Sequence, residues 1–313
     1  MQKIDLRGII PAIVTPMTHE GELDLPALKR YAEWLADQGP VALAVNVDTG
    51  EGPHLTVDEK RQTLETVAEA VAGKCKVVGG IAGPSTTQGI ANARAAQAAG
   101  ADALLIFPIS AFLGQPLNPE IPYRYHAAIA EAVDLPLILF QLQPALGGVL
   151  YTTEILHKLI TIPSVAAIKE ASFDAMRFLQ VKAALESASR KITLLTGNDN
   201  FICESFILGA EGALLGFSTI GTREQVNMLE AIQRGDMAEA RELGARLQPL
   251  ADVIFAPPVT DYRARTKEAL RMLGILDNTT VRPPLLPISE AECETIRQAL
   301  QHAGLLLSTV SEQ

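Results

Sequence analysis

Residues 98–105 read Ala-Ala-Gly-Ala-Asp-Ala-Leu-Leu, and this stretch joins the end of a helical pattern to the start of a short apolar run. Gly100 follows the last helical residues, at the position past a helix C-cap where glycine adopts the left-handed conformation at little cost. The apolar run Ala103–Phe107 has the length of a buried strand. The stretch therefore predicts a helix that passes through a glycine turn into a strand.

The same unit recurs along the chain, although its sequence does not repeat. Eight short apolar runs predict strands, at Ile9–Val14, Val41–Val47, Lys76–Ala82, Ala103–Phe107, Pro136–Gln141, Val165–Lys169, Ile192–Thr196 and Ala213–Phe217. Each run is followed by a longer pattern with apolar residues at helical spacing. These patterns predict helices at Leu25–Gln38, Val57–Ala72, Thr87–Ala98, Pro119–Ala132, Thr153–Ile160, Ala175–Glu186, Asp199–Leu208 and Arg223–Arg234.

Eight strand-then-helix units in succession predict a (β/α)8 TIM barrel, which is an α/β fold with parallel strands. The main alternative is a doubly wound open sheet, which usually needs fewer strands. The chain has neither a G-x-G-x-x-G nor a G-x-x-x-x-G-K-[ST] motif, so we favour the barrel. After about residue 235 only helical patterns remain, at Met237–Ile254, Val259–Leu273 and Glu290–Ala303. We therefore expect a barrel over residues 1–235 and a C-terminal helical extension over residues 236–313.

Composition excludes several classes of protein. The 313 residues are 48% hydrophobic but only 5% aromatic, which suits an aliphatic core around a covered parallel sheet. The three cysteines lie far apart and no H-x-x-x-H motif occurs, so we expect neither a disulfide scaffold nor a metal site. The net charge of −10 without a Lys/Arg run argues against nucleic-acid binding.

Nothing in the sequence suggests a membrane protein. Polar residues and prolines interrupt the longest apolar stretches, so none of them is expected to span a bilayer. The N-terminus lacks the apolar run of a signal peptide, and unpaired cysteines suit a reducing compartment. We therefore expect the protein to be cytoplasmic.

Lys169 ends an otherwise apolar predicted strand, Val165–Lys169. Catalytic residues of a barrel come from the carboxyl ends of its strands, so this lysine is expected at the mouth of the barrel. Burial disfavours an ammonium ion, and a neutral amine can attack a ketone to form a Schiff base. The alternative is a structural lysine that reaches solvent or pairs with Glu170.

Two turns after predicted strands offer groups that could bind a substrate. Thr49-Gly50 brings a hydroxyl and backbone N–H groups that can hold a carboxylate or a phosphate, or it is a simple turn made by glycine. Gly197-Asn198-Asp199 can bind substrate hydroxyls, or its polar side chains cap the following helix.

Taken together, these segments resemble the pyruvate-dependent class I aldolases and dehydratases, the family of dihydrodipicolinate synthase and N-acetylneuraminate lyase. The matching segments cover nearly the whole chain: Gly8–Ala12, Val14–Pro16, Thr49–Glu51, Gly100–Ala103, Ile168–Ala171, Gly197–Asp199, Gly209–Gly212, Lys267–Leu270 and Arg282–Pro284. The resemblance implies a (β/α)8 barrel with a helical extension, assembled as a homotetramer or homodimer. It also implies that Lys169 forms an imine with a small 2-oxo acid, without a further cofactor, and that Thr49 and Gly50 hold the substrate carboxylate. Further substrate contacts are expected from residues at the strand ends: Phe140, Gln141, Asn198, Asp199 and Ser218.

Four departures from the family pattern bear on the reaction. Phe140 stands where the family usually has a tyrosine that relays protons, and phenylalanine has no hydroxyl. Asp48 replaces the first threonine of the turn, and Pro108-Ile109-Ser110 replaces the usual Pro-Tyr-Tyr. The segment Gln143–Gly147 has no basic residue for a second carboxylate. We therefore expect that the chain is not a true dihydrodipicolinate synthase. Asp48 is our candidate for the proton transfer, and its alternative role is that of a turn residue.

The sequence thus predicts a Schiff-base-forming lyase of the dehydratase or aldolase type. Its substrate would be a 2-oxo acid such as pyruvate or a 2-keto-3-deoxy sugar acid, and the bond cleaved would be carbon–oxygen or carbon–carbon. The missing tyrosine favours dehydration slightly, because a dehydration can use an acid at another place in the site. The alternative is a non-catalytic barrel that keeps the carboxylate pocket and binds a metabolite.

Overall fold

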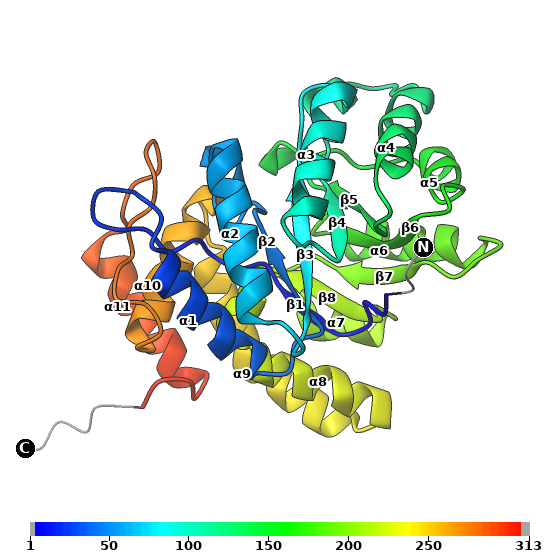
Figure 1. Ribbon diagram of the computed structural model, residues 1–313. Helices are drawn as coiled ribbons and strands as arrows, with labels where there is room; N and C mark the ends of the chain where they lie inside the picture. The colour runs from blue at the N-terminus through cyan, green and yellow to red at the C-terminus, as the bar shows by residue number, and fades with distance from the viewer. Residues whose placement is uncertain (1–3, 308–313) are drawn as a thin grey trace, which may run out of the picture.

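The computed structural model describes residues 4–307 and has eight parallel strands that form a barrel (Figure 1). The strands are β1 (Ile9–Pro11), β2 (Ala42–Val45), β3 (Lys76–Ile81), β4 (Ala103–Ile106), β5 (Leu137–Leu142), β6 (Val165–Ala171), β7 (Thr193–Thr196) and β8 (Gly212–Leu215). They pair in the order β1-β8-β7-β6-β5-β4-β3-β2, and a parallel bridge between Ala12 and Ala44 joins the two ends of the sheet. The predicted (β/α)8 barrel is confirmed, and the open sheet is wrong.

A helix follows each strand on the outside of the barrel. These helices are α1 (Leu25–Ala36), α2 (Val57–Ala70), α3 (Thr86–Ala98), α4 (Glu120–Ala132), α5 (Thr153–Leu159), α6 (Ala175–Glu186), α7 (Ile202–Ile207) and α8 (Thr222–Arg234). The helix predicted at Asp199–Leu208 starts later than expected, because Asp199 lies in the turn before it and bonds to the chain after β8.

The stretch at residues 98–105 has the predicted form. Helix α3 ends at Ala98, Gly100 adopts a φ of +95°, and β4 begins at Ala103. Asp102 Oδ2 accepts a hydrogen bond of 2.9 Å from the backbone N–H of Val77. This bond ties the turn to the neighbouring strand β3 and so fixes where β4 enters the sheet.

Side chains of successive strand residues alternate between two apolar layers. In β5, Ile138 and Phe140 belong to the cluster inside the barrel, whereas Leu137 and Leu139 pack among the residues between barrel and helices. This alternation is the period-2 geometry of any strand. It means that neighbours such as Phe140 and Gln141 must point in opposite directions.

The C-terminal helices form a group of their own beside the barrel. Helices α9 (Met237–Ile254), α10 (Tyr262–Met272) and α11 (Glu290–His302) pack on one another and lie near α1 and α2 in Figure 1. The predicted division at residue 235 falls between α8, which ends at Arg234, and α9. A short 3-10 turn, Val259–Asp261, occupies the start of the predicted helix Val259–Leu273.

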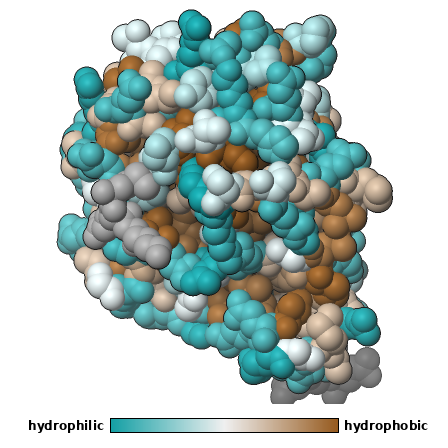
Figure 2. All heavy atoms as spheres, turned by 90° about the vertical axis from the view of Figure 1, so that its right-hand side faces the viewer, coloured by the Kyte–Doolittle hydropathy of each residue, from teal (hydrophilic) through white to brown (hydrophobic). Residues whose placement is uncertain are grey.

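The surface is mixed in character. Hydrophilic and hydrophobic residues are interspersed on the face that lies at the right of Figure 1, as Figure 2 shows. This is usual for the surface of a folded protein. Within residues 4–307, no helix combines the length and the apolar character that are needed to cross a membrane.

Candidate active site

A cavity that is partly open to solvent lies where the strands of the barrel end. It is lined by Val47, Asp48, Thr49, Phe107, Phe140, Leu142, Leu146, Lys169, Ala171, Phe173, Gly197, Asp199, Gly216, Phe255 and Tyr262. Residues from six strand ends meet here with Phe255 and Tyr262 of the helical extension. The place agrees with the rule that barrel enzymes build their sites at the carboxyl ends of the strands.

Lys169 lies in this cavity, near the end of β6. Its Nζ sits 4.3 Å from the centre of the Phe140 ring on the neighbouring strand β5. Burial lowers the pKa of the amine from its ordinary 10.5 to about 8, while the carboxylates of Asp199 and Asp48 act in the opposite direction. At pH 7 about a tenth of the amine is therefore neutral and nucleophilic, far more than for a lysine with the ordinary pKa.

Gly197 makes room for the lysine. A Cβ atom at this position would lie 2.7 Å from Lys169 Cε and 2.8 Å from the Cβ of Ala171. Both distances are too short for atoms that are not bonded. The glycine after β7 is therefore required by the path of the Lys169 side chain rather than by its own backbone conformation.

Asp199 is a buried carboxylic acid in the same cavity. One of its oxygens, Oδ1, accepts a hydrogen bond of 3.0 Å from the backbone N–H of Phe217. Burial raises the pKa of Asp199 from 3.8 to about 7, although this hydrogen bond and the Lys169 ammonium lower it. Asp199 and Lys169 thus have similar proton affinities within one cavity, which is the arrangement that acid–base catalysis needs.

Asp48 and Thr49 line the cavity from the loop after β2, and both lie close to Tyr262 of α10. The Tyr262 hydroxyl donates a 2.9 Å hydrogen bond to Asp48 Oδ2 and lies 3.5 Å from Thr49 Oγ1. Its ring stacks on Phe255, with ring centres 4.8 Å apart. Burial and the Asp48 carboxylate hold the pKa of Tyr262 well above its usual value, so the hydroxyl keeps its proton.

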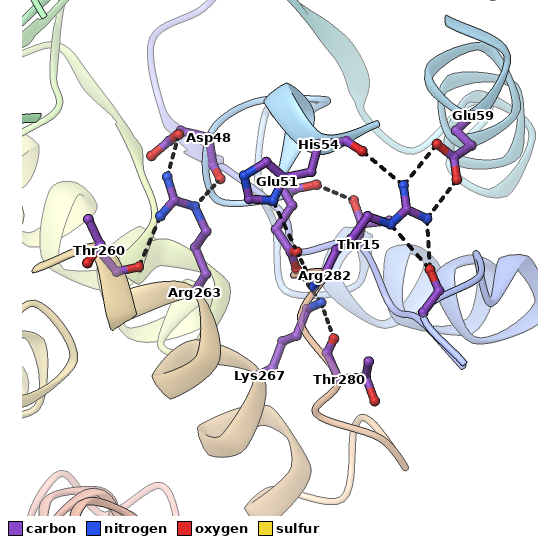
Figure 3. Close-up of polar contacts among 12 residues, drawn as sticks. Thr15, Asp48, Glu51, His54, Glu59, Thr260, Arg263, Lys267, Thr280 and Arg282 are labelled. Atoms are coloured by element: carbon purple, nitrogen blue, oxygen red, sulfur yellow. Dashed lines mark hydrogen bonds and ion pairs between the residues drawn. The ribbon is translucent and has the colours of Figure 1, made fainter. Parts of the chain in front are cut away.

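Three basic residues of the helical extension hold the loop after β2 in place (Figure 3). Arg263 binds Asp48, with Nη2 at 2.5 Å from Oδ1 and Nε donating to the backbone carbonyl at 2.9 Å. Lys267 and Glu51 form a fully buried ion pair of 2.6 Å, and Lys267 also donates to the Thr280 carbonyl.

Arg282 is the third of these basic residues. It binds both carboxylate oxygens of Glu59 at the start of α2, at 2.9 and 2.7 Å. Its backbone N–H donates to Glu51 Oε2 at 2.8 Å. Because a buried ion pair is costly to break, the extension fixes the loop that carries Asp48 and Thr49.

The structure brings together five of the predicted site residues, namely Lys169, Asp48, Thr49, Phe140 and Asp199. Gly50 does not line the cavity. Its carbonyl accepts a 2.7 Å hydrogen bond from Thr15 Oγ1, and a Cβ here would come within 2.8 Å of the Ile13 carbonyl oxygen. This glycine therefore allows a close approach of two backbone segments behind Thr49.

Three expected substrate contacts do not fit this geometry, because their side chains are buried outside the cavity. Gln141 points away from the barrel interior, and its Nε2 donates to Glu170 Oε1 at 2.9 Å. Asn198 Nδ2 donates to Glu170 Oε2 at 2.7 Å, so that Glu170 links the two amides. The Ser218 hydroxyl donates to Gln225 Oε1 at 2.6 Å. We therefore correct these three predictions, since all three residues support the site from behind.

Several residues that line or hold the cavity were not expected from the sequence, among them Tyr262, Phe173 and Arg263. Tyr262 and Arg263 come from the helical extension, more than 200 positions after Asp48, and no local pattern connects such distant segments. Phe173 lines the cavity with a φ of +61°, a conformation that a bulky side chain rarely adopts. In residues 4–307, no three His, Cys, Asp or Glu side chains lie together as metal ligands would.

Comparisons with known proteins agree with the fold. The model of the dihydrodipicolinate synthetase family matches residues 5–303. The 4-hydroxy-tetrahydrodipicolinate synthase of Gluconacetobacter diazotrophicus is 30% identical over 306 residues, which cover 98% of this chain and 100% of that protein.

Solved structures give the same result. The dihydrodipicolinate synthase of Cyanidioschyzon merolae, solved with lysine bound, is 30% identical with a TM-score of 0.86, covering 97% of this chain and 100% of that one. YagE of E. coli K12, solved in complex with pyruvate, is 25% identical with a TM-score of 0.88, covering 96% and 99%. The chain therefore belongs to the dihydrodipicolinate synthetase family of lyases.

Proposed function

We propose that the protein is a Schiff-base-forming lyase that acts on a 2-oxo acid through an imine on Lys169. The observation that carries the proposal is the Lys169 amine, with a pKa lowered to about 8, in one cavity with the carboxyl group of Asp199. The amine nitrogen attacks the C2 carbonyl carbon of the substrate, and water leaves as the imine forms. The protonated imine then accepts the electrons that are released when a bond at C3 breaks.

In this proposal Asp199 prepares the nucleophile by taking the proton of the Lys169 ammonium. The two pKa values, about 8 and about 7, lie close together, so this transfer costs on the order of 1 kcal/mol. The same transfer between groups with the ordinary values of 10.5 and 3.8 would cost about 9 kcal/mol. Burial of both groups thus makes the free amine accessible near neutral pH.

The hydroxyl that Phe140 lacks is supplied by Tyr262 in our proposal. Dehydration and aldol cleavage both take one proton from the substrate and return one. Tyr262 can accept a proton from the substrate while it passes its own proton to Asp48, to which it is already hydrogen-bonded. Asp48 thus keeps the proton-transfer role that we expected from the sequence, but it exercises this role through the tyrosine.

The proposed carboxylate site is the loop that begins with Asp48 and Thr49, since Thr49 lines the cavity. The pyruvate bound to the related YagE supports a 2-oxo acid as the ligand of this site. Among the described residues that line the cavity, Lys169 is the one cation, so a second carboxylate would find no partner there. We therefore propose that the reaction is not that of dihydrodipicolinate synthase, although relatives carry that name.

The experiment is borohydride reduction of the protein with pyruvate or with a 2-keto-3-deoxy sugar acid, followed by mass spectrometry of the peptides. We expect a stable adduct on Lys169 and no adduct in Lys169→Ala. A ligand that raises the melting temperature without any adduct or turnover would instead favour the metabolite-binding barrel. Product analysis by NMR then separates dehydration from aldol cleavage, and condensation of pyruvate with aspartate semialdehyde tests the dihydrodipicolinate synthase reaction directly.

The assembly and the cellular location remain proposals as well. The family resemblance supports a homotetramer or homodimer, which sedimentation velocity measures at working concentration. A cytoplasmic location is proposed from the sequence, and fractionation of cells that produce the protein tests it.

A further inference from the structure

Most of the cavity wall consists of hydrocarbon. Four aromatic rings and two leucines contribute, namely Phe107, Phe140, Phe173, Phe255, Leu142 and Leu146. Phe107 and Phe140 meet edge to face with ring centres 5.0 Å apart. A wall of this kind stabilises an apolar ligand group, because the group leaves water when it binds.

The polar groups in the cavity are few, and most of them already have partners. Asp48 is bound by Arg263 and by the Tyr262 hydroxyl, and Asp199 accepts the N–H of Phe217. A chain of substrate hydroxyls needs several free donors and acceptors to replace its hydrogen bonds with water. The cavity therefore suits a polyhydroxylated substrate poorly.

Phe173 contributes to this wall from an unusual backbone conformation. Its φ of +61° lies in the left-handed region, where a bulky side chain is strained and glycine is the ordinary choice. Asn198 Oδ1 accepts its backbone N–H at 2.7 Å, and Asn200 Nδ2 donates to its carbonyl at 3.3 Å. Asn198 is itself anchored on the buried Glu170.

These hydrogen bonds hold the backbone of Phe173 in its strained conformation, and Phe173 lines the cavity. Strained residues persist only where the surrounding structure holds them, and they concentrate at ligand sites. A glycine at position 173 would satisfy the same backbone bonds without strain. Phenylalanine at this position therefore adds a ring to the cavity lining at the expense of backbone strain.

The loop after β5 completes the apolar wall. The backbone N–H of Leu142 donates to the Val149 carbonyl at 3.2 Å, so residues 143–148 form a closed loop with a short 3-10 turn at Pro144–Leu146. Leu146 lines the cavity from this turn, and Leu142 lines it from the end of the strand. The loop thus brings hydrocarbon to the cavity and no charged group.

We propose that the cavity takes a 2-oxo acid whose end distant from the oxo group is an uncharged hydrocarbon group, and that Phe173 selects for that group. This inference rests on the proposed imine at Lys169 for the oxo-acid end of the ligand. The end of the ligand distant from the oxo group is then neither a chain of hydroxyls nor a second carboxylate.

The test compares four 2-oxo acids in borohydride trapping at Lys169: pyruvate, 2-oxo-4-phenylbutanoate, 2-keto-3-deoxygluconate and 2-oxoglutarate. The measured quantity is the concentration that gives half-maximal adduct. We expect this concentration to be at least tenfold lower for the phenyl acid than for the sugar acid or the diacid. Equal values, or tighter trapping of either polar acid, would overturn the inference.

Two variants locate the selectivity. Phe173→Gly and Phe173→Ala should both lose most of the preference for the phenyl acid over the sugar acid and the diacid, by about tenfold. Phe173→Gly should melt at a higher temperature than Phe173→Ala, because only glycine is unstrained at this φ. The exposed Leu179→Ala on α6 is the control and should keep the full preference. An unchanged preference in both Phe173 variants would contradict the role of the ring.

A ligand without an oxo group separates this inference from the proposed function. 4-Phenylbutanoate cannot form an imine, so its binding is measured by calorimetry. In one outcome no acid is trapped on Lys169, but 4-phenylbutanoate binds the wild type at least tenfold more tightly than Phe173→Gly. This result would contradict the imine and support the apolar site. If pyruvate is trapped and 4-phenylbutanoate does not bind, the imine stands and the apolar site fails.

Discussion

The substitution Asp199→Asn isolates the cost of a buried charge in the cavity. Asn keeps the size of the side chain and an oxygen that can accept the N–H of Phe217, but it has no charge. The pKa of Asp199 is raised by burial from 3.8 to about 7. Between these values the unfolded chain has already lost the proton that the folded protein still holds.

The sign of the effect follows from this difference. Because the folded state binds more protons, the free energy of unfolding of the wild type falls as pH rises from 3.8 towards 7. The loss reaches about 2 kcal/mol at about pH 5 and about 4 kcal/mol at about pH 8, because a shift in pKa is a difference in binding free energy of the proton. Asp199→Asn has no such loss. The difference in unfolding free energy between this variant and the wild type should therefore grow by about 2–3 kcal/mol from about pH 5 to about pH 8.

Urea unfolding at both pH values measures the difference. The exposed Asp134→Asn gives the baseline for exchanging a carboxylate for an amide. An advantage of Asp199→Asn that does not change with pH would refute the reasoning, since it would mean that the folded protein does not raise the pKa of this carboxyl group.

Three further substitutions test separate parts of the account. Gly197→Ala should slow trapping about 100-fold without unfolding the protein, because the new Cβ would lie 2.7 Å from Lys169 Cε. Trapping kinetics measure the rate, and circular dichroism checks the fold. Unchanged kinetics would contradict the prediction. Tyr262→Phe should lower kcat by a factor of about 10²–10⁴ and leave trapping intact, because only the relay hydroxyl is lost. An equal loss of kcat and of trapping rate would argue for a structural role instead. Lys267→Met should cost about 3–5 kcal/mol of unfolding free energy in urea, because Glu51 is then buried without a partner, and adding Glu51→Gln should recover part of that loss. Full stability of Lys267→Met alone would show that the buried pair does not hold the loop.

The fold was predictable because the patterns that specify its strands and helices lie within short windows of the sequence. The recurrence of short apolar runs and amphipathic patterns is visible in any window of the sequence, and the glycine turn at Gly100 marks one boundary directly. The same reasoning placed Lys169 correctly at a strand end. It failed for Gln141 because the period of two in a strand puts this residue on the opposite face from Phe140.

The rest of the site depends on contacts that sequence patterns do not contain. Asn198 was expected to meet a substrate, yet it bonds to Glu170 and to the backbone of Phe173, which lies 25 positions earlier. Tyr262 reaches Asp48 only because the helical extension packs against the loop after β2. Its sequence neighbourhood reads as an ordinary helix start, so only the tertiary structure reveals that it lines the cavity.

The central claim is that Lys169 reacts as a free amine in this cavity. The most direct measurement is the rate of imine formation with pyruvate as a function of pH, quenched with borohydride and read at the Lys169 peptide. We expect an adduct on Lys169 whose rate of formation is half-maximal near the lowered pKa of about 8. An adduct on another lysine, or a half-maximal rate near the ordinary value of 10.5, would contradict it.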